Sequence, residues 1–263
     1  SRVRVLRTAV NANTLVTEAV IAKSNRPPPV LELPGDTLVE SRDQRMIVLG
    51  TTGLTLIGIT QTASQLSLMS IVVAVTIAFI FADFLTGVFH WGTDNYGSLE
   101  TPLVGPACAA FQGHHRAPWT ITYRSTANNV FKIAKIVAPL ILLSMIFAPP
   151  ALALFLIIAL YSQILSQEFH KYSHMLPREQ PQFIRFLQRY GLAISTAEHG
   201  RHHTSPYEGH YTIFNGILNP LLDRTHFFRR LEAFFYRRFG IEPNCWNEGD
   251  EKGQRIRKLA LSL

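Results

Sequence analysis

The chain has 263 residues, of which 47% are hydrophobic and 16% are charged, whereas about 25% of residues are charged in a typical soluble domain. Its net charge of +7 suits an anionic partner, either nucleic acid or a membrane surface, and no nucleic-acid-binding motif is present. The two cysteines, Cys108 and Cys245, exclude a disulfide framework and a cysteine-based zinc site.

Residues 1–45 differ from the rest of the chain. Residues 1–30 contain a single acid, Glu18, and several basic residues, and they end in Pro27, Pro28 and Pro29. Such a basic, acid-poor start is typical of an organelle transit peptide, and an ordinary disordered tail is the alternative. We therefore assign residues 1–45 to a transit-peptide-like or disordered segment and residues 46–263 to one membrane domain.

Two long tracts contain no Asp, Glu, Lys or Arg: one runs from Met46 to Ala82 and the other from Ile136 to Gln167. Soluble helices need polar side chains on their outer face, so a deeply buried pair of core helices is the weaker explanation. Polar residues 61–65 interrupt the first tract, and Pro149 and Pro150 interrupt the second. The segments are about 46–59, 66–89, 133–147 and 151–167. They predict an all-α integral membrane fold with about four transmembrane or hairpin helices.

Each tract is predicted to enter the membrane and return through a short uncharged connection. All charged residues then fall on one side of the membrane, and so do the histidines, which form a histidine-rich cap. The excess of basic residues places this side toward the cytosol or the stroma.

A basic amphipathic helix is predicted at about residues 225–240. Six apolar residues recur there at helical spacing and the arginines lie mostly on the other face, which favours a helix on the membrane surface. A helix packed on the rest of the domain is the alternative. The apolar residues are Phe227, Phe228, Leu231, Phe234, Phe235 and Phe239, and the arginines are Arg229, Arg230, Arg237 and Arg238.

Eight of the ten histidines fall into four groups whose local spacings suit metal binding. Residues three or four apart share one side of a helix, and adjacent residues diverge by about 100°, so an adjacent pair can serve two metals. Asp94 follows His90 by four residues. The predicted ligands are His90, Asp94, His114, His115, His170, His174, His199, His202 and His203.

Nine ligands exceed the capacity of one ion but suit two five- or six-coordinate ions. Imidazole binds iron, zinc, copper and nickel, and a structural zinc site is tetrahedral, so two iron ions with positions left open for O2 fit best. For any single histidine an ordinary hydrogen-bonding role is the alternative. We interpret His210 and His226 as non-ligands.

Asp83 shares one helix stripe with Gly87, His90 and Asp94. A carboxylate often accepts the second ring N–H of a ligand histidine, and we predict this role for Asp83. An interfacial acid that faces water is the alternative.

Long motifs in the cap resemble the Kua-type lipid desaturases. They are HWGTDNYG from His90, FQGHHRAPWTIT from Phe111, QILSQEFHKYSH from Gln163 and HGRHHTSP from His199. The FQGHH and PWTIT runs look like the plant chloroplast branch, the fatty acid desaturase 4 type, which forms the trans-3 double bond of palmitate in phosphatidylglycerol. The animal and bacterial branch desaturates plasmanylethanolamine.

This resemblance implies a di-iron centre, O2 as co-substrate and ferredoxin as electron donor. It also implies a chloroplast membrane, thylakoid or envelope, with the endoplasmic reticulum as the alternative. A basic loop with Arg116, Arg124 and Lys132 is a candidate contact for an anionic lipid head group. A lipid hydroxylase remains as a rival enzyme, and a histidine-rich metal transporter remains as a rival outside the enzymes.

Overall fold

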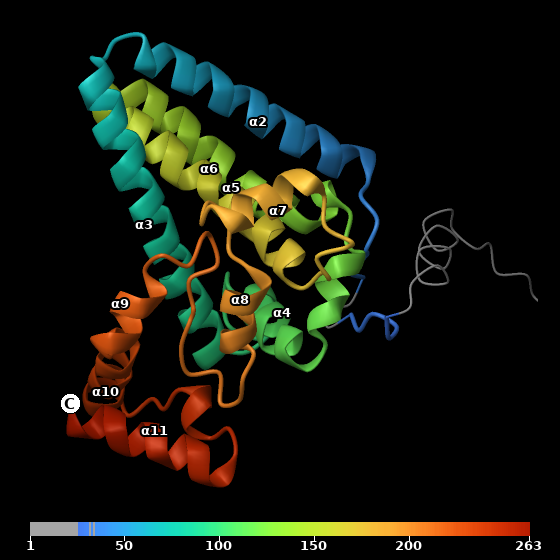
Figure 1. Ribbon diagram of the computed structural model, residues 1–263, viewed down its shortest axis with the longest axis vertical. Coiled ribbons are helices and arrows are strands. Elements are labelled where there is room, and N and C mark those ends of the chain that lie inside the picture. Colours follow the sequence, from blue (N-terminus) through green and yellow to red (C-terminus); the bar gives the residue numbers. More distant parts are fainter. Residues whose placement is uncertain (1–25, 32, 34) are drawn as a thin grey trace, which may run out of the picture.

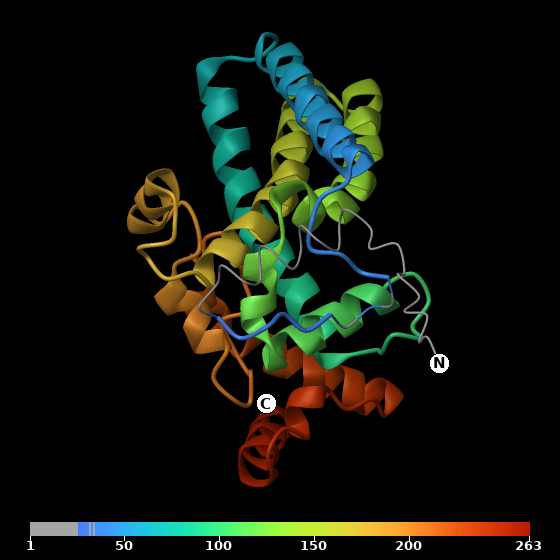
Figure 2. The same cartoon turned by 90° about the vertical axis from the view of Figure 1, so that its right-hand side faces the viewer.

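The computed structural model describes residues 26–31, 33 and 35–263, and this part of the chain is helical with no strand. Four long helices form a bundle at one end of the molecule, and the shorter helices form a cap at the other end (Figures 1 and 2). The bundle consists of α2 (Arg42–Ala63), α3 (Leu68–Asn95), α5 (Thr126–Phe147) and α6 (Pro150–Ser173). The cap contains α4 (Gly105–Arg116), η1 (Pro118–Tyr123), α7 (Gln182–Arg189), α8 (Thr196–His202), α9 (Asn219–Arg224), α10 (Phe227–Phe239), η2 (Asn244–Trp246) and α11 (Asp250–Ser262).

The four bundle helices have 22, 28, 22 and 24 residues and are apolar enough to cross a membrane, for which about 20 residues are needed. This confirms the predicted all-α membrane fold. The helices are longer than the apolar segments because they continue into polar residues. At the start of α2, for example, the Ser41 hydroxyl accepts the N–H of Gln44, and the Gln44 side chain accepts the N–H of Ser41.

The outer face of the bundle is apolar and exposed, as expected for contact with lipid. Leu56, Val72 and Ile146 are each more than half exposed. Small residues instead line the contacts between helices, which allows the backbones to approach closely. A Cβ atom on Gly58 of α2, for example, would lie 2.9 Å from the Cδ1 atom of Ile157 on α6.

The connections 64–67 and 148–149 lie at the end of the bundle that is remote from the cap (Figure 1). The charged residues of the four helices lie toward the opposite ends of these helices, next to the cap. They are Arg42, Asp43, Arg45, Asp83, Asp94, Lys132, Lys135, Glu168 and Lys171. The there-and-back topology with a histidine-rich cap on one face is therefore confirmed.

The segment that precedes α2 packs against η1. The Trp119 indole N–H donates to the carbonyl of Pro28 over 3.0 Å, and the N–H of Val30 donates to the Thr120 hydroxyl over 2.9 Å. Residues 26–31 thus contact the cap, and α2 begins at Arg42, four residues before the charge-free tract. Residues 1–25, which carry most of the predicted transit peptide, lie outside the described residues.

Helix α10 packs on the rest of the cap with part of its predicted polar face. Arg229 is buried and forms an ion pair of 2.5 Å with Glu232, which is fully buried. Phe228 is buried as well, whereas Phe234 and Phe239 are more than half exposed. The arginine expected on the outer face is therefore inside because a buried carboxylate one turn away neutralises it.

Candidate metal centre

The nine predicted ligands converge in two groups at the junction of bundle and cap. The five-histidine group consists of His114 from α4, His170 and His174 from the end of α6, and His199 and His203 from α8 and its C-cap. The Asp94 group consists of His90 and Asp94 from α3, His115 from α4 and His202 from α8. In each group one possible ligand atom per residue lies within 4.8 Å of all the others.

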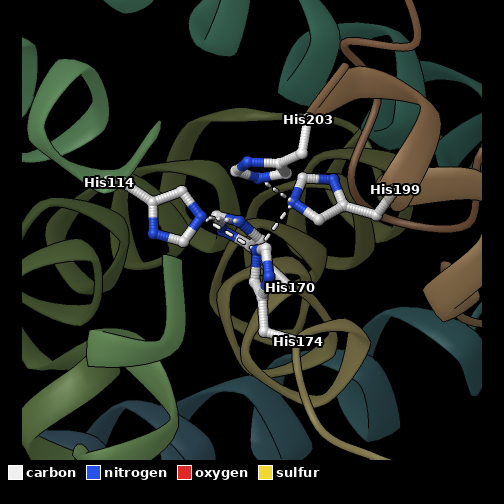
Figure 3. Close-up of side chains that lie close together, drawn as sticks. All are labelled: His114, His170, His174, His199 and His203. Carbon is white, nitrogen blue, oxygen red and sulfur yellow. Dashed lines mark hydrogen bonds between the residues drawn. The ribbon is translucent and has the colours of Figure 1, made fainter. Parts of the chain in front are cut away.

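The rings of the five-histidine group point toward one another (Figure 3). The Nε2 atom of His114 lies 2.9 Å from that of His174 and 3.0 Å from that of His170. The Nε2 atom of His199 lies 2.9 Å from that of His174 and 3.0 Å from that of His203. Two nitrogens bound at right angles, about 2.1 Å from one ion, are about 3.0 Å apart, so these spacings fit a common ion.

The Asp94 group gathers three imidazoles around one carboxylate oxygen. The Oδ2 atom of Asp94 lies 3.3 Å from the Nε2 atoms of His90 and His202, and 3.5 Å from that of His115. The Nε2 atoms of His202 and His115 are 3.1 Å apart. All four side chains are at least 90% buried, so little of this group is in contact with water.

Hydrogen bonds of His90 and His202 show which ring nitrogen carries the proton and which one presents a lone pair. The Nδ1 atom of His90 lies 2.9 Å from the carbonyl of Tyr211, and that of His202 lies 2.8 Å from the carbonyl of Gly209. A carbonyl only accepts, so Nδ1 carries the proton and, in the neutral ring, Nε2 presents a lone pair. These lone pairs face the Asp94 carboxylate. Within the described residues, His90 Nε2 and both Asp94 oxygens have no hydrogen-bond partner.

Buried lone pairs and a carboxylate that face one another repel, and a bound cation would remove this repulsion. Metal-bound histidines usually donate their other N–H to a carbonyl or carboxylate, as His90 and His202 do. The donor set therefore fits a metal on an observation of the structure. The buried Nδ1 atoms of His170 and His199 have no partner within the described residues, and nothing in the structure explains this.

Five of the predicted ligand histidines in the cap, His114, His115, His174, His199 and His203, are neutral at physiological pH. Burial, together with the neighbouring imidazoles, lowers the pKa of His115 to about 2 and that of His174 to about 3. Burial also lowers the pKa of His114, His199 and His203. Each ring can therefore offer a lone pair to a metal without first releasing a proton.

Asp83 does not contact a ligand histidine as predicted. It is fully buried, and its carboxylate accepts hydrogen bonds from the backbone N–H groups of residues 215, 216 and 218, each at a distance of 3.0 Å. One turn away, the Thr86 hydroxyl accepts the N–H of Ile213 over 3.1 Å. The same loop carries the Tyr211 carbonyl that holds His90, so Asp83 fixes to α3 the loop that supports this histidine.

His210 and His226 lie outside both groups. The Nδ1 atom of His210 lies 2.7 Å from a Glu198 oxygen, and its Nε2 atom lies 3.5 Å from an oxygen of Asp223. Glu198 also accepts from the Asn219 amide over 3.1 Å. These contacts tie α8 to the loop that follows it, and sequence spacing alone gave no signal for them.

Of the three basic residues considered for a lipid head group, Arg124 is engaged within the protein. Its guanidinium pairs with Asp36 and donates to the Thr37 carbonyl and the Asn128 amide oxygen, both over 2.9 Å. Asp36 is partly desolvated, but the pairing with Arg124 outweighs this and lowers the pKa of its carboxyl. Arg124 thus anchors the N-terminal segment to α5.

The chain matches the lipid desaturase domain over residues 79–246, a range that includes all nine predicted ligands. It is 39% identical over 171 residues to the chloroplastic fatty acid desaturase 4-like 1 and to the chloroplastic fatty acid desaturase 4 of Arabidopsis thaliana. Each match covers 65% of this chain, and the two cover 58% and 53% of those relatives. It is also 32% identical over 189 residues to the plasmanylethanolamine desaturase of Myxococcus xanthus, covering 70% of this chain and 66% of that relative.

No solved structure matches the chain. The domain match spans well over half of the sequence and coincides with the part of the fold that gathers the histidines and the ends of the bundle helices. The chain therefore belongs to the lipid desaturase domain family.

Proposed function

We propose that the chain is a di-iron, oxygen-dependent desaturase of the acyl chain of a membrane lipid. The observation that carries the proposal is the convergence of nine side chains into two adjacent ligand groups at the cap end of four apolar helices. The five-histidine group would hold one iron and the Asp94 group the other. Five and four protein ligands leave positions open on both ions, which a reaction with O2 requires.

When bound, iron would supply the oxidising power, with O2, two electrons and two protons, that removes two hydrogens from neighbouring acyl carbons and releases two water molecules. The protein's own residues hold the predicted ligands in fixed orientations and limit the access of water. The carbonyls of Tyr211 and Gly209 orient His90 and His202, so the ring lone pairs point inward. His90, Asp94, His170, His199 and His202 are buried, which limits the access of bulk water and protects reactive species from side reactions.

The palmitoyl chain of phosphatidylglycerol, desaturated at position 3 in the trans geometry, is the substrate that we propose. The sequence resemblance to the plant chloroplast branch supports it, as do the two chloroplastic relatives named fatty acid desaturases. Ferredoxin as electron donor and a thylakoid or envelope location follow from the same reasoning. The relative named plasmanylethanolamine desaturase supplies the alternative substrate.

The test expresses the chain and its variants in a host that lacks the product, and then measures lipids by mass spectrometry and iron in the purified protein. His170→Ala and His174→Ala should abolish the double bond and lower the iron content. His226→Ala is the matched control, because His226 lies outside both ligand groups. Retained desaturation with undiminished iron in either ligand variant contradicts the ligand assignment. A hydroxylated lipid in place of the alkene identifies the rival hydroxylase.

The position of the ligand groups disfavours a metal transporter. A transport path needs polar ligands near the middle of the bilayer. His90 and Asp94 instead lie in the last turns of α3, and His170 lies in the last turn of α6, all beside the cap. Metal flux into vesicles that contain the protein, without oxygen-dependent lipid product, would favour the transporter.

A further inference from the structure

A small cavity of about 90 Å³ lies directly beside the five-histidine group. His114 and His170 form part of its wall, and apolar side chains of α4 and η1, such as Phe111 and Ile121, form another part. The segment that precedes α2 contributes Val30. The cavity therefore brings an apolar surface into contact with two of the five convergent histidines.

A second cavity, of about 310 Å³, reaches the other ligand group and has a different character. It is lined by Asp94 and His115 together with polar residues such as Gln112 and Asn244. Neither cavity touches the ligand group of the other. The apolar approach thus leads to the five-histidine group, and the polar approach leads to the Asp94 group.

Apolar contacts connect the first cavity with the outer surface of the bundle. Phe89 of α3 is 47% exposed, and its ring centroid lies 5.7 Å from that of Phe111. The Phe111 ring in turn lies 6.4 Å from the ring of His170. Ala110, another lining residue, is exposed. A row of aromatic contacts therefore runs from the exposed Phe89 through Phe111 to His170 at the cavity wall.

The charges at the cavity also exclude a phosphate as its occupant. Arg124 lines it, but its guanidinium is engaged by Asp36, the Thr37 carbonyl and the Asn128 side chain. The remaining lining is mostly apolar or small. The volume of about 90 Å³ is several times the roughly 10–15 Å³ that a single water molecule requires, so a short stretch of hydrocarbon fits.

We propose that this cavity binds the acyl carbons that are desaturated, and that the rest of the lipid stays along the exposed apolar surface near Phe89. The proposal rests on the proposed function and adds the place where the substrate meets the metal centre. An iron held by the five-histidine group would then face the acyl chain, and the polar cavity would offer water and protons a route to the Asp94 group.

The test uses full-length, iron-loaded protein in nanodiscs that contain phosphatidylglycerol with a photoreactive diazirine near the carboxyl end of one acyl chain. After illumination, mass spectrometry maps the labelled residues. We expect adducts on residues 110–121 and loss of these adducts in Ala110→Trp, with unchanged iron content. Ala109→Trp is the matched control, because Ala109 is half-buried on the same helix and does not line the cavity.

Adducts at Tyr207 or Asn244 of the polar cavity, or labelling that survives Ala110→Trp, overturn the proposal. Failure of the proposed function gives a different result, since the wild-type protein would then form no alkene while the adducts on residues 110–121 remain. Should Ala110→Trp fail to fold, Ala110→Leu repeats the comparison against Ala109→Leu.

Discussion

Acidification should destabilise the iron-free protein because its cap holds histidines that stay unprotonated when folded. The pKa of His115 is about 2 and that of His174 about 3 in the folded chain, against 6.5 for the unperturbed group. Below pH 6.5 the unfolded chain therefore binds protons that the folded chain does not. The free energy of unfolding must fall as the pH falls through 6.5, and this destabilisation is absent well above that pH.

The size of the effect follows from these values. Between pH 7 and pH 5, an imidazole with a pKa of 6.5 in the unfolded chain that stays neutral in the folded chain costs about 2 kcal/mol. His115 and His174 together therefore lower the free energy of unfolding by about 4 kcal/mol, a large share of the typical stability of a protein. The lowered pKa values of the other cap histidines act in the same direction.

The assay is chemical unfolding of chelator-treated protein in detergent at several pH values, followed by the fluorescence of the buried Trp91 and Trp246. The double variant His115→Asn/His174→Asn should lose about 4 kcal/mol of the pH dependence, whereas His226→Asn should keep it. A stability that stays constant or rises on acidification to pH 5, or a double variant with the full wild-type pH dependence, would refute the reasoning.

Three further substitutions test the supports of the centre. Asp83→Asn removes an oxygen that accepts backbone N–H groups, so unfolding should require about 3 kcal/mol less and purified protein should contain less iron. Gly87→Ala should destabilise the protein by about 1–3 kcal/mol in thermal unfolding, because its Cβ would lie 2.7 Å from a side-chain carbon of the 211–218 loop. Gly92→Ala is the control and should leave the stability unchanged, because no atom lies within 4 Å of its Cβ position. Glu232→Gln leaves the buried Arg229 without its counter-charge and should cost about 3–5 kcal/mol in chemical unfolding, with the iron content as a second readout.

The sequence predicted the membrane fold well because its signal is local. Charge-free tracts such as Met46 to Ala82 mark membrane-spanning helices wherever they occur, and Pro149 and Pro150 mark the turn between two of them. Histidine spacing was informative for the same reason, since residues four apart on α6 share one face regardless of the rest of the fold.

Features that depend on contacts between segments far apart in the sequence could not be predicted from local patterns. Helix geometry indicated that His114 and His115 can serve two ions, but the partners that each one meets depend on the placement of α4 against α6 and α8. The helix stripe placed Asp83 on the correct side of α3, but an irregular loop, more than a hundred residues away in sequence, supplies its partners. Arg229 was misplaced because helical spacing does not show which face meets a buried acid.

The division of neighbouring histidines between the two groups has a consequence for metal uptake. Helix α4 gives His114 to one group and His115 to the other, and α8 with its C-cap divides His202 and His203 in the same manner. An ion that binds in either group therefore orients both short helices, and with them ligands of the second ion. We expect the two ions to enter cooperatively, so that protein with one ion stays scarce during titration.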